Sequence, residues 1–282
     1  LNMPPLRYRR DDIAELAEHF AQRMCRELGH DWFAGFGEAA RAFTASLKEA
    51  GVETFTAYDI KQGTPAGDDV ETAAEETAAA DTLRQAGGDV RFVALDVTDE
   101  ASVKSAAATV AGASDKLDVL VNNAGLGGER SIVEISDEEW SAVLAVTLDG
   151  TFRCTRAALR QMTARGSGVV VNNASVSGWR AQAGQAHYAA AKAGIMGLAK
   201  ALGRELAPLG IRANAVAAGP VDNNFTGGRM TPEIKADLAA KVPLGRLGTS
   251  DDIANACLFL ASDMSSFITG AVLDVNGGLH IH

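Results

Sequence analysis

Short apolar runs alternate with longer helical patterns from about residue 90 onward. The runs are rich in β-branched side chains and cover residues 90–95, 117–121, 169–172, 211–216 and 271–275. Between them, apolar positions recur at helical spacing over residues 100–111, 137–164, 186–207 and 250–262. Strands that alternate with helices in this order build a parallel sheet with helices on both faces. The pattern therefore predicts an α/β fold with a doubly wound, Rossmann-like parallel sheet.

The ends of the predicted helices carry capping signals. Ser136 and Ser250 each stand before acidic residues that suit a first helical turn, so both are expected to be N-caps. Gly210 is expected to close the long helix of residues 186–207 before the next strand begins.

Residues 1–30 show a different pattern, that of an amphipathic helix. Its apolar face holds Ile13, Leu16, Ala17, Phe20, Met24 and Leu28. We expect this face to pack or to contact a partner. The region resembles a piece of the AAA+ domain of bacterial enhancer-binding transcription activators, through Pro4-Pro5-Leu6-Arg7, Arg10-Asp11-Asp12-Ile13 and Met24-Cys25-Arg26-Glu27-Leu28. The sequence has no Walker A loop, so ATP hydrolysis does not follow. We therefore expect an N-terminal helical extension over residues 1–30 and a single domain over residues 31–282.

A glycine turn lies between two predicted strands, a short one at residues 30–34 and a longer one at residues 52–58. The turn reads Gly35-Phe36-Gly37-Glu38-Ala39-Ala40, and Asp59 follows about 20 residues later, as in a dinucleotide site. Gly35 and Gly37 would let the backbone approach a pyrophosphate. Asp59 would bind the adenosine ribose hydroxyls and repel a 2′-phosphate, which favours NAD over NADP. The turn resembles that of hydroxyacid dehydrogenases of the phosphogluconate type. A glycine-rich loop without a ligand is the alternative.

The residues best suited to chemistry follow the predicted strand at residues 169–172. Tyr188 and Lys192 are four positions apart at the start of a predicted helix, so both project from one face. A nearby ammonium would lower the tyrosine pKa from about 10 and let Tyr188 exchange a proton with an alcohol or ketone. Ser175 stands at the carboxyl end of a strand, where open parallel sheets bind ligands. Each residue alone is common in turns or on helix surfaces, but together they predict a catalytic site.

With these residues the sequence resembles the short-chain dehydrogenase/reductase family over about residues 80–278. In that family a serine, a Tyr-x-x-x-Lys pair and often an asparagine form the active site, which implies catalytic roles for Ser175, Tyr188 and Lys192. Thr147 stands where the asparagine holds a proton-relay water, and its hydroxyl could hold water in another way. The resemblance also implies that Lys192 holds the nicotinamide ribose.

The resemblance extends to further segments, which in the family surround the cofactor. Leu95-Asp96-Val97-Thr98 implies contacts with the adenine, Asn122-Asn123-Ala124-Gly125 a turn beside the cofactor, and Gly219-Pro220-Val221 a loop along the nicotinamide. The implied cofactor-binding residues are Asp96, Val97, Asn123, Ala124, Gly125, Tyr188, Lys192, Gly219 and Val221. The family's Thr-Gly-x-x-x-Gly-x-Gly turn is absent, and Ala218 and Asn223 replace a proline and a threonine.

Composition and charge limit the classes of molecule that the protein is expected to bind. A net charge of -10 argues against a surface that binds nucleic acid or an anionic membrane. The three cysteines, Cys25, Cys154 and Cys257, fit neither a disulfide framework nor a metal site. No apolar stretch approaches the ~20 residues of a membrane span. We therefore expect a cytoplasmic protein that acts on a small molecule, and the resemblance implies a homo-oligomer, either a tetramer or a dimer.

Two functions remain open from the sequence. The first is an NAD(P)-dependent oxidoreductase that transfers a hydride between a nicotinamide cofactor and a secondary alcohol or ketone, with Tyr188 as general acid or base. The second is a binding or scaffold protein that keeps the fold but lacks cofactor affinity because of its altered first turn. His187 points about 100 degrees away from Tyr188 along the helix, which favours packing or surface exposure. The substrate depends on the loops at residues 127–135 and 223–232.

Overall fold

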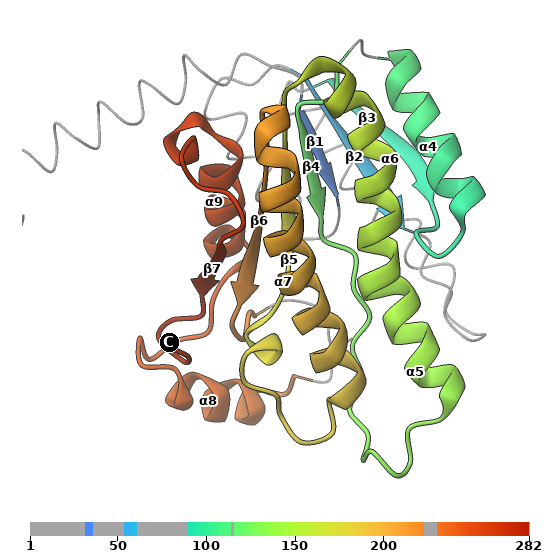
Figure 1. Cartoon of the computed structure of the whole chain (residues 1–282). Coiled ribbons are helices and arrows are strands. Elements are labelled where there is room, and N and C mark those ends of the chain that lie inside the picture. The colour runs from blue at the N-terminus through green and yellow to red at the C-terminus, as the bar shows by residue number, and fades with distance from the viewer. Residues whose placement is uncertain (1–31, 36–53, 61–88, 114–115, 223–229, 282) are drawn as a thin grey trace, which may run out of the picture.

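The computed structural model describes residues 32–35, 54–60, 89–113, 116–222 and 230–281 (Figure 1). For residues 32–35, 54–60, 89–92 and 94 the backbone alone is described. The expected extension over residues 1–30 and most of the glycine turn, including Gly37, lie outside the described residues. The resemblances to an AAA+ domain and to hydroxyacid dehydrogenases therefore stay predictions.

The described part of the chain holds seven β-strands in two hydrogen-bonded groups, each of them parallel. The first group is ordered β1 (Trp32–Gly35), β2 (Thr54–Ile60) and β3 (Asp89–Leu95). The second is ordered β4 (Val119–Asn122), β5 (Gly168–Asn173), β6 (Ile211–Ala218) and β7 (Val272–Val275). Because β1 lies beside β4, the strand order reverses between them, and such a reversal is where doubly wound sheets bind ligands.

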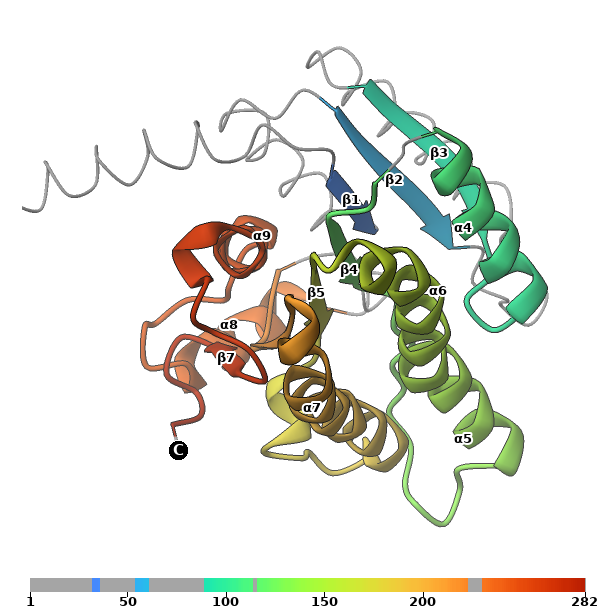
Figure 2. The same ribbon diagram turned by 45° about the horizontal axis from the view of Figure 1, so that its top comes forward.

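Helices cover both faces of the sheet (Figure 2). One face carries α4 (Glu100–Ala113), α6 (Gly150–Arg165) and α7 (Ala186–Leu206), and the other carries α9 (Ser250–Ala261). A hydrophobic core lies on each face of the sheet, and successive side chains of β4 point to opposite cores. Val119 and Val121 pack on the α9 side, whereas Leu120 packs on the α4 and α6 side. The predicted doubly wound, Rossmann-like fold is confirmed.

Two further helices lie near the carboxyl ends of the strands. They are α5 (Asp137–Leu144), which follows β4, and α8 (Pro232–Lys241), which follows β6. Ser136 caps α5 as predicted, because its side chain accepts a hydrogen bond from the backbone N of Glu139. The apolar pattern did not predict α8, which has no buried residue and therefore no apolar stripe.

One predicted helix boundary is wrong, and one predicted helix holds a distortion that the sequence did not predict. The chain is helical from Asp137 to Arg165, as expected for residues 137–164, but a π-helical turn, η2 (Ala145–Asp149), lies between α5 and α6. The N-cap of α9 is Thr249, which forms a capping box with Asp252, whereas Ser250 is the first helical residue. Gly210 does end the long helical stretch, in the left-handed region at φ 73°, after a short 3-10 turn, η4 (Ala207–Leu209). Among the described residues, no helix has the length and apolar character needed to cross a membrane.

Candidate active site

Ser175 lies just beyond the carboxyl end of β5. It begins the 3-10 turn η3 (Val176–Gly178), and its hydroxyl accepts a hydrogen bond from the backbone N of Ser177 at 3.1 Å. The same hydroxyl donates to the carbonyl of Ala218, the last residue of β6, at a long 3.5 Å. The side chain is buried, with 8% of its surface exposed. Ser175 is therefore held where two neighbouring strands end.

Tyr188 and Lys192 occupy the first two turns of α7 and lie beside Ser175. The side chains of Tyr188 and Ser175 are hydrogen-bonded. The Lys192 Nζ atom lies 5.6 Å from the centre of the Tyr188 ring and donates to the carbonyl of Asn173 at 2.6 Å. The structure thus brings together the three residues that the sequence singled out for catalysis.

Burial sets the protonation of this pair in a direction that the sequence did not predict. Burial raises the pKa of Tyr188 to about 12, although the hydrogen bond with Ser175 acts in the opposite direction. Burial lowers the pKa of Lys192 to about 7. The sequence led us to expect a lowered tyrosine pKa because of the neighbouring ammonium, but removal from water dominates and raises the pKa instead. Tyr188 is therefore a neutral phenol near pH 7, the form that can donate a proton.

Paired asparagines tie the carboxyl ends of β4 and β5 together. The amide Nδ2 of Asn122 donates to Asn172 Oδ1 at 2.8 Å and to Thr155 Oγ1 at 2.9 Å. One residue further along, Asn173 Nδ2 donates to Asn123 Oδ1 at 2.5 Å. The sequence analysis did not assign Asn173 to the site, although it accepts the Lys192 hydrogen bond. The signal was an Asn-Asn pair at the end of each of two predicted strands.

Thr147 lies in η2, fully buried, and its hydroxyl contacts the backbone. It accepts a hydrogen bond from Leu126 N at 3.0 Å and donates to Leu126 O at 3.3 Å. His187, which precedes Tyr188 in α7, is also fully buried, and its Nδ1 accepts from the backbone N of Tyr188 at 3.0 Å. Of the two placements expected for His187, packing is confirmed.

The residues implied in cofactor binding lie at the carboxyl ends of several strands. Asp96 and Val97 follow β3, and the Asp96 carboxylate accepts hydrogen bonds from the backbone N and the hydroxyl of Thr98 at 2.8 and 2.6 Å. A turn over residues 123–125, with Asn123, Ala124 and Gly125, follows β4. Gly35 ends β1, and Asp59 pairs in register with Ala94 next to the end of β2, whereas the Asp59 side chain lies outside the described residues.

Two glycines of this group lie close to other parts of the chain. A Cβ on Gly219 would lie 2.7 Å from the Cα of Asn276, so only glycine fits there without a backbone shift. A Cβ on Gly125 would lie 3.5 Å from Lys192 Nζ and 3.9 Å from Thr147 Oγ1, within the space beside the lysine. An ammonium has three donors, and Lys192 gives one of them to Asn173. The remaining donors of Lys192 are of the kind that could bind the hydroxyls of a ribose.

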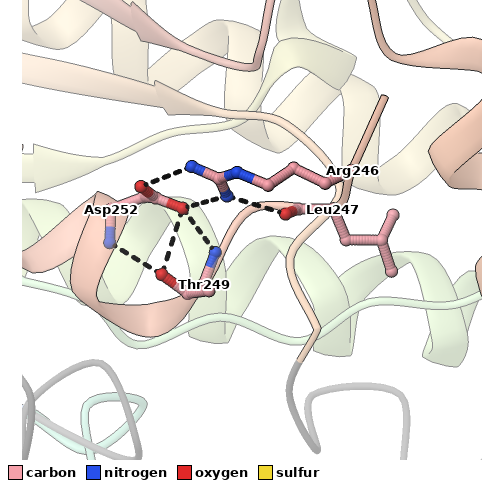
Figure 3. A network of polar contacts seen from close by, with 4 residues as sticks. All are labelled: Arg246, Leu247, Thr249 and Asp252. Atoms are coloured by element: carbon pink, nitrogen blue, oxygen red, sulfur yellow. Dashed lines mark hydrogen bonds and ion pairs between the residues drawn. The ribbon is translucent and has the colours of Figure 1, made fainter. Parts of the chain in front are cut away.

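The segment that precedes α9 is held by a network of polar contacts (Figure 3). Arg246 forms two hydrogen bonds to the Asp252 carboxylate, at 2.6 and 3.1 Å, and the same carboxylate accepts from the backbone N of Thr249 at 2.8 Å. The Arg246 guanidinium holds the pKa of Asp252 well below its usual range. Gly248, inside this segment, pairs with Val221 of the loop after β6. The predicted nicotinamide loop therefore rests on a capped helix end.

Trp179 fixes the loop between Ser175 and Tyr188 to the last strand and to the chain that follows it. Its Nε1 donates to Asp274 Oδ1 in β7 at 3.1 Å, and its ring stacks on His280 at 6.2 Å between centres. Arg180 donates to the carbonyl of Leu279 at 3.3 Å. Both residues thus hold the loop in place.

Neither thiol chemistry nor a metal centre is indicated in the described residues. Cys154 and Cys257 are free, and burial raises the pKa of each thiol to about 12. Such thiols are poor nucleophiles at neutral pH. Within the described ranges, no group of His, Cys, Asp and Glu side chains is arranged to hold a metal ion.

Comparison with known proteins covers most of the chain. Residues 40–280 match the family model described as enoyl-(acyl carrier protein) reductase. The chain is 40% identical over 213 residues to an uncharacterized short-chain type dehydrogenase/reductase of Sinorhizobium fredii, which covers 72% of this chain and 84% of that protein. It is 39% identical over 210 residues to the 3-oxoacyl-(acyl-carrier-protein) reductase FabG of Escherichia coli, with 74% and 86% covered.

A solved structure has the same fold. The crystal structure of gox2181 matches with a TM-score of 0.81 and 33% sequence identity, covering 92% of this chain and 98% of that chain. The family implied by the Ser175, Tyr188 and Lys192 motif is thus the one that the comparisons show. The chain belongs to the short-chain dehydrogenase/reductase family, oxidoreductases that transfer a hydride between a nicotinamide cofactor and a secondary alcohol or ketone.

Proposed function

We propose that this oxidoreductase uses Tyr188 as its general acid or base, Ser175 to hold the substrate oxygen and Lys192 to support the tyrosine. The observation that carries the proposal is the convergence of the three side chains, with Ser175 hydrogen-bonded to Tyr188 and Lys192 Nζ 5.6 Å from the tyrosine ring. Each comes from a different turn of the chain. A serine in a surface turn and an exposed i, i+4 pair would not meet in this way.

The protonation of the site favours the direction of ketone reduction. A nicotinamide cofactor, when bound, would supply a hydride for the carbonyl carbon. Tyr188, neutral because burial raises its pKa to about 12, gives its hydroxyl proton to the carbonyl oxygen, and an alcohol forms. Ser175 donates a hydrogen bond to the same oxygen and orients it. Lys192, when protonated, stabilises the phenolate that remains until Tyr188 regains a proton.

We propose NAD as the cofactor in preference to NADP. The support comes from the sequence of the first turn and from the backbone order, because β1 ends at Gly35 and Asp59 is next to the last residue of β2. An acid at that position binds ribose hydroxyls and repels a phosphate. Titration of the purified protein with NADH and with NADPH, followed by fluorescence, should give a lower Kd for NADH. Equal or tighter binding of NADPH would overturn the preference.

Substitution of Tyr188 tests the catalytic assignment. Tyr188→Phe removes the hydroxyl and keeps the ring, so turnover should fall by about 100-fold to 10,000-fold, the usual contribution of a general acid or base. The Kd for NADH should stay near that of the wild type, which serves as the control. Unchanged turnover would remove Tyr188 from the mechanism.

The same titration decides between enzyme and scaffold. A wild-type chain that saturates with neither cofactor would favour the binding or scaffold protein that keeps the fold. A cytoplasmic location and a homotetramer or homodimer are likewise proposals, and they rest on composition and on the family resemblance.

A further inference from the structure

The π-helical turn η2 contacts the backbone that follows β4. Thr147, at the centre of η2, has no exposed surface, and its hydroxyl both accepts from Leu126 N and donates to Leu126 O. Its own carbonyl accepts a hydrogen bond from Thr151 Oγ1 at 2.8 Å. A hydroxyl has a single proton, and here that proton goes to a protein carbonyl. Thr147 is therefore engaged in holding the chain itself.

Leu126 directly follows the turn that the cofactor is proposed to contact. That turn ends at Gly125, whose open side faces Thr147 Oγ1 and Lys192 Nζ. Fixing both backbone groups of Leu126 therefore fixes the place of Gly125 relative to Lys192. A shift of the turn toward Lys192 would close the space that Gly125 leaves open.

The other end of η2 contacts the segment that follows β3. Gly150, the residue directly after η2, comes so close to Val97 that a Cβ there would lie 2.7 Å from Val97 Cγ2. Arg153, in the next turn, donates from Nη1 to the carbonyls of Val97 and Ala145, at 3.3 and 3.4 Å. It also pairs with Asp149 at 3.6 Å. One short turn thus joins both segments proposed to hold the cofactor.

We propose that Thr147 is a positioning residue, which holds the turn of residues 123–125 for the cofactor by bonding both backbone groups of Leu126. Gly150 and Arg153 join the same π-helical turn to Val97, so that the adenine side and the nicotinamide side of the site move as one unit. This inference rests on the proposed function, since it assigns Thr147 to cofactor positioning. It replaces the expectation that the Thr147 hydroxyl serves a proton-relay water.

Thr147→Val is the central variant, because valine has the shape of threonine without the hydroxyl. The matched control is Thr163→Val, which removes an exposed hydroxyl from α6 that bonds the carbonyl of Leu159 at 2.6 Å. Hydrogen exchange at the Leu126 amide should become faster in Thr147→Val and stay unchanged in Thr163→Val. This measurement needs no cofactor, so it tests the link even if the proposed function fails. Unchanged exchange in Thr147→Val would overturn the link.

Cofactor affinity and turnover then separate positioning from a proton relay. We expect Thr147→Val to raise the Kd for NADH about tenfold, which corresponds to about 1.4 kcal/mol. Its solvent isotope effect on kcat should match that of the wild type, and Thr147→Ser should restore the Kd because it restores the hydroxyl. A wild-type Kd together with a lower kcat and a changed isotope effect would overturn positioning in favour of the relay.

Arg153 tests the adenine side with an independent variant. Arg153→Met should raise the Kd for AMP, a fragment without nicotinamide, about tenfold. The control is Arg156→Met on the same helix, which breaks a 3.1 Å ion pair with Glu100 and leaves Val97 untouched. The double variant Arg153→Met with Thr147→Val should weaken NADH binding by less than the sum of the two single effects, because both residues act through η2. Fully additive effects would overturn the coupling between the two sides.

Discussion

The carboxyl ends of β4 and β5 are held by side chains, whereas the loop after β6 is held by backbone. At the first place, Asn122 bonds Asn172 and Asn123 bonds Asn173 through their amides. At the second, the backbone N of Gly219 donates to Val275 O at 2.9 Å, and Gly248 N donates to Pro220 O at 2.9 Å. The two regions border the same proposed site but depend on the sequence in different ways.

The difference explains which departures from the family pattern the fold accepts. Ala218 replaces a proline beside the backbone-held loop, yet its carbonyl still accepts from Ser175 and its neighbour Gly219 still pairs with Val275. Backbone bonds tolerate a change of side chain as long as no new atom collides. The side-chain-held ends have no such freedom, because each amide supplies the bond itself.

The largest expected effect on stability concerns Lys192, whose Nζ donates a hydrogen bond to the Asn173 carbonyl. Burial lowers its pKa from 10.5 to about 7, so between these values the unfolded chain binds more protons at this group than the folded chain. Its contribution to the free energy of unfolding therefore rises with pH and is lost as pH falls toward about 7. Relative to Lys192→Met, the wild type should gain up to about 3 kcal/mol between about pH 7 and about pH 9.

Denaturant unfolding of both chains at the two pH values measures this gain. Lys200→Met, which removes an exposed lysine from α7, is the control and should follow the wild type. Parallel stability curves for wild type and Lys192→Met would show that Lys192 stays charged in the folded chain.

The next effect breaks the backbone-held loop. Gly219→Ala places a Cβ 2.7 Å from the Cα of Asn276, and this overpacking should lower the free energy of unfolding by about 1–3 kcal/mol. The matched change Gly197→Ala, at an exposed helical position with nothing within 4 Å of the added atom, should instead raise it by about 0.5–1 kcal/mol. If thermal unfolding shows both alanines to be stabilising, the loop is not held as tightly as the contacts indicate.

Asn122→Leu breaks the side-chain-held region. It removes the donor to Asn172 Oδ1 and Thr155 Oγ1 and leaves these buried atoms short of a partner, at a cost of about 1–3 kcal/mol. Thr155→Val removes one member of the same network and, combined with Asn122→Leu, should add little further loss in a double-mutant cycle. Independent effects in denaturant unfolding would mean that the asparagine and the threonine act separately.

The smallest effect is expected at the ion pair that precedes α9. Arg246→Met removes the bond to Asp252, but the arginine side chain is 54% exposed, so the loss should be only about 0–1 kcal/mol. The capping bonds between Thr249 and Asp252 remain. A loss well above this range in chemical denaturation would show that the exposed pair, rather than the backbone, fixes the loop.

The sequence predicted what depends on periodic apolar positions and on short spacings. Leu120 and its neighbours alternate between the two cores, so the β4 run was visible, and the spacing of four residues placed Tyr188 and Lys192 on one face of α7. The end of an apolar run likewise placed Ser175 beyond β5. Each of these features depends only on residues that are close together in the sequence, so the pattern of those residues was enough to predict it.

Features that depend on distant partners were not predictable. Thr147 bonds Leu126, which is 21 residues away, and Lys192 bonds Asn173, 19 residues away. The apolar spacing runs on through η2, so it predicted the helical stretch but not the π-helical turn within it. The direction of the Tyr188 pKa shift depends on how many atoms surround the phenol, which spacing along the helix does not contain.

The π-helical turn also holds one residue more than an α-helical turn would. Its hydrogen bonds join residues five apart instead of four, so a single deletion within η2 would convert it to regular α-helix and keep α6 near its present rotational phase. Arg153 would then stay close to Val97 and Met162 would stay buried, whereas Thr147 would lose the wide turn in which it contacts Leu126. The extra residue of this turn therefore matters more for Thr147 than for the packing of α6.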